Sequence, residues 1–130
     1  NMVFDFDKSL SFEGDSGPYI QYTYVRTQSI LSRVEQVSGD MVAPESIPEA
    51  ARRLERFPEA LEKSLRDFSP HHVAQYVYEL AQAFNSFYAE TKIADTSNHN
   101  FVYNVELTRA VGDTLQKGLA LIGIDTVERM

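Results

Sequence analysis

Apolar residues recur at helical spacing in several segments of the chain, and short polar segments rich in glycine and proline separate them. In the first such segment, residues three or four positions apart predict one buried helix face: Ile20, Tyr24, Thr27, Leu31 and Val34. The segment before it ends in Gly17 and Pro18, and proline suits the first turn of a helix. The spacing predicts a helix from about Pro18 to Gln36.

Two more long helices are predicted further along the chain. Ser69 and Pro70 are typical of a helix start. They precede a wide apolar stripe formed by Val73, Tyr76, Val77, Leu80, Phe84, Phe87 and Tyr88. After a polar loop at 92–100, the last helix is predicted from about Phe101 to Ile122. Gly123 then suits the left-handed position that ends a helix, and Ile124 suits the apolar contact that accompanies this cap.

Between the first and the second long helix lie two near-copies that each begin with Pro-Glu-Ala, at Pro48 and at Pro58. They indicate two short helices or one helix kinked at Pro58. Residues 3–12 alternate too briefly to distinguish a strand from a short helix. No long alternating run rich in β-branched residues occurs, so we expect an all-α bundle of four or five main helices.

Length and composition favour a globular protein. With 130 residues, of which 43% are hydrophobic, the chain suffices for a single domain with its own core, which we place at 1–130. No run is long enough to span a membrane, and there is no signal peptide pattern. Cysteine is absent, which excludes disulfides and thiolate zinc sites and suits a reducing compartment. We therefore expect a cytoplasmic protein with no membrane partner.

The formal net charge is −7, which on its own argues against nucleic acid, because contacts to phosphate dominate that affinity. An uneven charge distribution could offset this, as could phosphate contacts made by other parts of a larger protein. The first residue is Asn rather than Met, and we expect the chain to be a piece of a longer protein.

No arrangement of residues predicts catalysis. The sequence has no glycine-rich phosphate loop. His71 and His72 are adjacent, so on a helix their rings point about 100° apart and do not share a metal. Asp5 and Asp7 have no third carboxylate nearby in the sequence. We therefore expect no catalytic residue and no metal site in these 130 residues.

Aromatic and cationic residues share one strip of the first predicted helix, away from its apolar face: Tyr19, Tyr22, Arg26, Ser29 and Arg33. Aromatic rings and guanidinium groups stack on unpaired bases, and the positive charge meets phosphate. The alternative is that the two tyrosine rings pack within the protein. On the second long helix, Asn85 lies among aromatic residues and is either a satisfied core amide or a reader of a base.

Several segments together resemble the carboxy-terminal domain of arginyl-tRNA synthetases. The amino-terminal part carries Val3-Phe4-Asp5-Phe6-Asp7, Leu10-Ser11-Phe12-Glu13-Gly14 and Gly17-Pro18-Tyr19-Ile20-Gln21-Tyr22. The middle carries Arg56-Phe57-Pro58-Glu59 and the run from Tyr76 to Tyr88, and the end carries Gly118-Leu119, Gly123-Ile124 and Glu128-Arg129-Met130. Their order and spacing make the resemblance specific.

The resemblance implies a DALR-type anticodon-binding domain of a class I aminoacyl-tRNA synthetase, which holds the anticodon stem-loop of arginine tRNA. It implies a parent arginine-tRNA ligase whose upstream catalytic domain uses ATP and magnesium, with no cofactor in the present chain. The implied RNA-binding residues are Tyr19, Tyr22, Arg26, Asn85, Tyr88, Arg129 and Met130. The alternative is a helical protein–protein interaction module with no role in RNA binding.

Two positions depart from the family pattern. Asn104 stands where the family often has an arginine, and Val127 replaces a frequent proline. The loss of a cation at position 104 weakens the expectation that the last helix holds a phosphate.

Overall fold

The structure is a computed structural model, which describes residues 16–34, 37–124 and 126. These residues form five α-helices and no strand. The helices are α2 (Ser16–Ser32), α3 (Glu49–Leu54), α4 (Phe57–Arg66), α5 (His71–Glu90) and α6 (Phe101–Leu121). The predicted all-α bundle is confirmed, and the segment 48–68 forms two short helices rather than one kinked helix.

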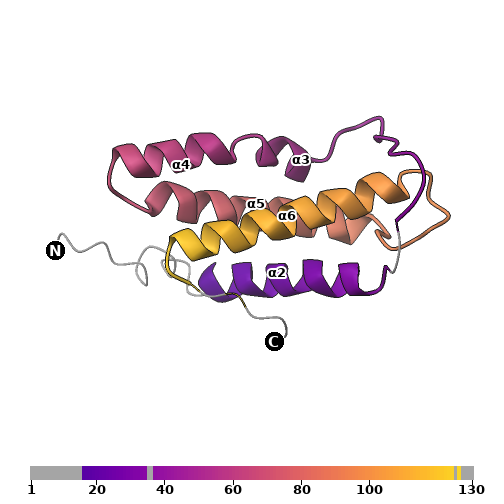
Figure 1. Ribbon diagram of the computed structural model, residues 1–130, viewed down its shortest axis with the longest axis horizontal. Helices are drawn as coiled ribbons and strands as arrows, with labels where there is room; N and C mark the ends of the chain where they lie inside the picture. The colour runs from indigo at the N-terminus through magenta and orange to yellow at the C-terminus, as the bar shows by residue number, and fades with distance from the viewer. Residues whose placement is uncertain (1–15, 35–36, 125, 127–130) are drawn as a thin grey trace.

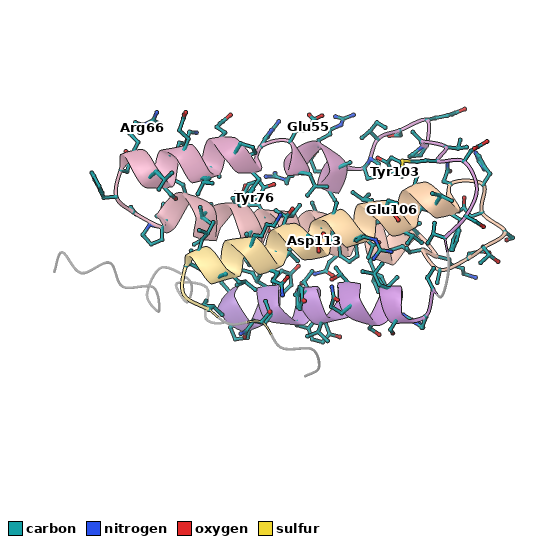
Figure 2. All side chains as sticks on the ribbon, viewed as in Figure 1. Glu55, Arg66, Tyr76, Tyr103, Glu106 and Asp113 are labelled. Carbon is teal, nitrogen blue, oxygen red and sulfur yellow. The ribbon has the colours of Figure 1, made fainter. Side chains whose placement is uncertain are left out.

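The long helices α5 and α6 form the centre of the bundle (Figure 1). Helix α2 packs on α5 and α6 from one side, and α3 and α4 pack on α5 from the other side. The start of α2, the α4–α5 turn and the end of α6 lie together at one end of the bundle, on the left in Figure 1. On the outer side of α3–α4, Glu55 and Arg66 are directed away from the bundle (Figure 2).

The core forms where the apolar faces of the three long helices meet. Ile20 from α2, Leu80 and Phe84 from α5, and Val111 and Leu115 from α6 have no exposed surface. Burial of such a side chain contributes about 1.5–3 kcal/mol relative to leaving it exposed. Tertiary packing, more than intrinsic helix propensity, therefore stabilises these helices.

Two glycines of α6 allow its neighbours to approach closely. A Cβ atom at Gly118 would lie 2.2 Å from Val77 Cγ1 of α5, and one at Gly112 would lie 2.6 Å from Thr27 Oγ1 of α2. Both distances are far below van der Waals contact, so each glycine occupies a helix–helix crossing that no larger residue fits without movement.

The end of α6 confirms the predicted cap. Gly123 has φ +84°, and the amide of Ile124 donates to the carbonyl of Leu119 at 2.9 Å while the amide of Gly123 donates to the carbonyl of Ala120 at 3.1 Å. These are the two hydrogen bonds of a Schellman motif. Ile124 packs against the core, as expected.

Two details of the helix predictions are wrong. Helix α2 ends at Ser32 rather than at Gln36, which lies outside the described residues. The hydroxyl of Ser32 donates to the carbonyl of Ser29 at 2.7 Å, and such local bonds compete with the helical hydrogen bonds. Tyr88, assigned to the core stripe of α5, is 36% exposed, because it lies near the end of that helix, where its ring stacks on Phe84 and also contacts Arg26 of α2.

Within these described ranges, no helix is both long and apolar enough to cross a bilayer. In the same residues, no group of three or more histidine, aspartate or glutamate side chains is arranged to hold a metal ion.

Candidate nucleic-acid interface

The guanidinium group of Arg26 lies between two aromatic rings on the surface formed by α2 and α5. Its Cζ atom is 4.2 Å from the centre of the Tyr88 ring and 5.2 Å from that of the Tyr22 ring. Both distances are in the range of cation–π contacts. The two rings come from different helices, so packing of α2 on α5 creates this arrangement.

A hydrogen bond across the helix pair fixes Arg26. Its Nη1 atom donates to Oδ1 of Asn85 at 2.6 Å, a charge-assisted bond between residues 59 positions apart in the sequence. Its Nη2 atom lies 3.5 Å from the Tyr22 hydroxyl, which is a weak contact. The guanidinium plane is therefore held against the Tyr88 ring rather than extending freely into solvent.

The amide of Asn85 is itself anchored to α2. Its Nδ2 atom donates to the hydroxyl oxygens of Thr23 at 2.9 Å and Tyr19 at 3.0 Å. Thr23 donates its only hydroxyl hydrogen to the carbonyl of Tyr19, so it must accept from Asn85. Because Arg26 can only donate, the orientation of the amide follows from these partners: Oδ1 faces Arg26 and Nδ2 faces the two hydroxyl groups.

These contacts bear on the two alternatives for Asn85. Both of its N–H hydrogens are used within the protein, and its oxygen accepts from Arg26. The arrangement favours the satisfied amide over the direct reader of a base.

Tyr19 and Tyr22 differ in their surroundings. Tyr19 is half-buried, and its ring centre lies 5.5 Å from that of Tyr78 on α5, so this tyrosine does pack within the protein. Tyr22 is 52% exposed. The first ring therefore supports the site, and the second presents a face to solvent.

We call Tyr19, Tyr22, Arg26, Asn85 and Tyr88 the α2–α5 cluster. These are five of the seven residues that the sequence singled out for RNA binding, and the fold brings all five together. The other two, Arg129 and Met130, lie outside the described residues. Thr23 completes the network, and sequence reasoning missed it because its position on the buried side of α2 resembles that of any core threonine.

A groove of about 520 Å³ borders the cluster at Tyr88. Arg33 at the end of α2 and Lys92 after α5 contribute positive charge to its lining, together with the carboxylate of Asp95 and the apolar side chains of Ile30 and Ile93. Hydrogen bonds from the hydroxyl and, to a smaller extent, the backbone amide of Ser97 lower the pKa of Asp95. Arg33 belongs to the strip that the sequence predicts. Lys92 was not identified from the sequence, because it lies in a polar loop with no recognisable motif.

Asn104, the position that departs from the family pattern, is 3% exposed. An asparagine there belongs to the packed start of α6 rather than to the exposed surface around Arg26. The absence of an arginine at position 104 therefore leaves the α2–α5 cluster unchanged.

Comparison with known proteins gives consistent results. Residues 20–130 match the DALR anticodon binding domain family. The chain is similar to the arginine–tRNA ligases of Sodalis glossinidius, with 40% identity, and of Flavobacterium psychrophilum, with 35% identity, over 98% and 100% of its length.

Among solved structures, the arginyl-tRNA synthetase of Thermus thermophilus resembles 98% of this chain with a TM-score of 0.72 and 32% identity. The chain spans 23% of that structure's chain and 22–23% of the two ligases. The family match covers most of the chain and agrees with its helical fold. The chain belongs to the DALR anticodon binding domain family.

Proposed function

We propose that this chain is the carboxy-terminal domain of an arginine-tRNA ligase and that its α2–α5 cluster holds the anticodon stem-loop of arginine tRNA. The observation that carries the proposal is the Arg26 guanidinium, held between the rings of Tyr22 and Tyr88 by Asn85. Membership of the family supports RNA over the alternative of a protein–protein interaction module.

The exposed rings supply stacking surfaces for unpaired bases. Tyr22 and Tyr88 are 52% and 36% exposed, and stacking on an aromatic side chain contributes about 1–3 kcal/mol per base. Arg26 adds a planar cation beside them. Because Arg26 is already held in place, less side-chain entropy is lost when RNA binds.

In this proposal Asn85 acts through its neighbours. It positions Arg26 by accepting from Nη1 and positions the Tyr19 hydroxyl by donating to it. Since that hydroxyl accepts from Asn85, its own hydrogen is left to be donated to a phosphate or a base. Asn85 is thus a positioning residue, which orients the Arg26 guanidinium and the Tyr19 hydroxyl beside the exposed rings of Tyr22 and Tyr88.

We assign contacts with the RNA backbone to the neighbouring groove. Arg33 and Lys92 are suited to pair with phosphates beside a base stacked on Tyr88. Arg129 and Met130 remain proposed contacts on the basis of the family resemblance. A methionine side chain there would offer an adaptable apolar surface to a base.

The net charge of −7 limits the affinity of this chain alone. In the proposed parent enzyme, an upstream catalytic domain joins arginine to the tRNA in the cytoplasm with ATP and magnesium, and it supplies further phosphate contacts. The present chain orients the RNA and takes no part in the chemistry.

A gel-shift experiment with the arginine anticodon stem-loop tests the proposal. We expect wild-type binding to weaken as salt rises, to weaken when the anticodon bases are changed, and to weaken in Tyr22→Ala with native circular dichroism. A control is Tyr103→Ala, a tyrosine of α6 that does not belong to the cluster. Equal binding of matched and mismatched loops, or unaltered binding in Tyr22→Ala, would rule the site out.

A further inference from the structure

The end of helix α4 has the same hydrogen bonds as the end of α6, but with a phenylalanine in place of the glycine. The amide of Ser69 donates to the carbonyl of Ser64 at 3.0 Å, and the amide of Phe68 donates to that of Leu65 at 3.3 Å. Phe68 has φ +50°, the left-handed conformation that usually requires glycine. A bulky L residue is strained in this region of φ and ψ.

The Phe68 side chain gains nothing from the rest of this domain in return for that strain. It is 97% exposed, the highest exposure among the large hydrophobic residues described. Local stability therefore explains neither the backbone conformation nor the position of the ring. Strain that the local structure does not require is a reason to look for a functional contact.

Two other exposed apolar side chains line the same groove as Phe68. Leu65 and Leu121 are 68% and 53% exposed, and we call these two residues with Phe68 the α4-end patch. All three line a mainly apolar groove of about 300 Å³, together with the buried side chains of Val73 and Ile122. A large ring beside an apolar groove is typical of an interaction surface.

The position of the patch indicates what covers it. It lies at the end of the bundle where α2 begins, on the left in Figure 1, and Ile124, two residues after Ile122, packs close to Gly17 of α2. The start of α2 and the α4-end patch therefore lie at the same end of the bundle. The matched relatives are about four times longer than this chain, which covers 22–24% of their length.

We propose that the α4-end patch docks against an apolar surface of the preceding, catalytic part of the full-length protein. This rests on the proposed function, which places that part before the present chain. Phe68 inserts into the partner surface, and Leu65 and Leu121 pack at its sides. Helix α4 lies on the opposite side of α5 and α6 from α2 (Figure 1), so docking leaves the α2–α5 cluster open to RNA.

The test compares Phe68→Gly in the 130-residue chain and in the full-length protein. In the short chain, glycine removes the strain, and we expect the unfolding midpoint to rise by about 2 °C. In the full-length protein we expect the midpoint to fall, because the docking contact is lost. Leu121→Ser is a second variant, at a position without backbone strain. It should lower the unfolding midpoint of the full-length protein by more than it lowers that of the short chain.

Hydrogen exchange gives an independent readout. Amides of residues 64–73 should exchange more slowly in the wild-type full-length protein than in the short chain, and Phe68→Gly should remove that protection. Equal exchange in both wild-type proteins, or the same midpoint change for Phe68→Gly in both, overturns the proposal. So does a concentration-dependent dimer of the short chain that Phe68→Gly dissociates in sedimentation, since the patch would then bind a second copy.

RNA binding separates this inference from the proposed function. Phe68→Gly in the short chain should bind the arginine anticodon stem-loop as wild type does. If the wild-type chain fails to bind that RNA, the proposed function fails, while the docking measurements still report on the patch. If RNA binds and the exchange data show no protection, only the docking proposal fails.

Discussion

Two regions of this molecule expose aromatic rings in different structural settings. In the α2–α5 cluster, Tyr22 and Tyr88 flank a guanidinium group that hydrogen bonds hold in place. In the α4-end patch, Phe68 is almost fully exposed on a strained backbone. The left-handed conformation costs an L residue about 1–2 kcal/mol.

The contrast separates two kinds of binding surface. The first surface combines aromatic and polar groups that are partly exposed and held in place by hydrogen bonds, which suits a ligand that binds from solution and dissociates again. The second is apolar and unfavourable when exposed, which suits a contact formed permanently within a larger protein.

The largest effect is expected at Arg26. Arg26→Ala removes the cation between the two rings, and we expect the affinity for the arginine anticodon stem-loop to fall about 10–100-fold. Fluorescence anisotropy at fixed salt would measure it. Arg26→Lys is the matched control: it keeps the charge but loses the planar group, so it should restore only part of the affinity. Full recovery in Arg26→Lys would mean that charge alone matters.

A buried tyrosine provides a reference for the exposed ones. Burial raises the pKa of Tyr76 to about 12, against the opposing influence of Arg53 and Arg56. Its hydroxyl donates to the carbonyl of Arg53. Because this pKa is raised in the folded protein, the neutral Tyr76 side chain contributes its full stabilisation below pH 10. That stabilisation is lost as the pH rises through 12.

We expect the free energy of unfolding to fall by about 2 kcal/mol by pH 12 for this reason. Urea unfolding at several pH values measures the loss, with Tyr76→Phe as the variant that lacks the ionisable group. An identical alkaline decline in wild type and Tyr76→Phe would assign the loss to other groups.

A smaller effect is expected at Asn85. Asn85→Ala leaves Arg26 without its hydrogen-bond acceptor, and we expect about fivefold weaker RNA binding. Because Asn85 itself contacts no phosphate in our proposal, the salt dependence of binding should keep its slope. In Lys92→Ala, by contrast, the slope of log affinity against log salt concentration should decrease in magnitude by about one, because one fewer counterion is released. A changed slope in Asn85→Ala would show that the asparagine does more than position Arg26.

The smallest effect is expected at the end of α6. Gly123→Ala places a Cβ atom on a residue with φ +84° and should destabilise the chain by about 1 kcal/mol. Gly123→Asn should be milder, since asparagine tolerates this conformation. Thermal unfolding of both variants, beside Phe68→Gly, compares the two helix ends directly. If Phe68→Gly destabilised the short chain, the end of α4 would not be strained, and the proposed difference between the two helix ends would be wrong.

The sequence predicts most of the fold because local signals mark most helix ends. Pro70 and Gly123 lie where proline and glycine are favoured, and the helices begin or end beside them. The end of α2 carries no such residue, and apolar spacing alone continues past Ser32. Phe68 contradicts the preference for glycine, so no sequence rule identifies the position as the end of a helix.

The candidate site follows from the sequence in part. Helical spacing places Tyr19, Tyr22 and Arg26 on one strip of α2, and the family resemblance adds the residues of α5. The bond between Arg26 and Asn85 joins positions 59 residues apart. It depends on the angle and offset at which α2 packs on α5, which residue spacing within one helix does not contain.

Chemical-shift mapping tests the α2–α5 cluster most directly. The arginine anticodon stem-loop is added stepwise to the ¹⁵N-labelled 130-residue chain, and amide shifts are followed at each step. We expect the largest changes at residues 19–33 and 85–92, and little change at 64–73. Changes concentrated at the α4-end patch, with the amides of α2 unmoved, would contradict the assignment of RNA binding to the cluster.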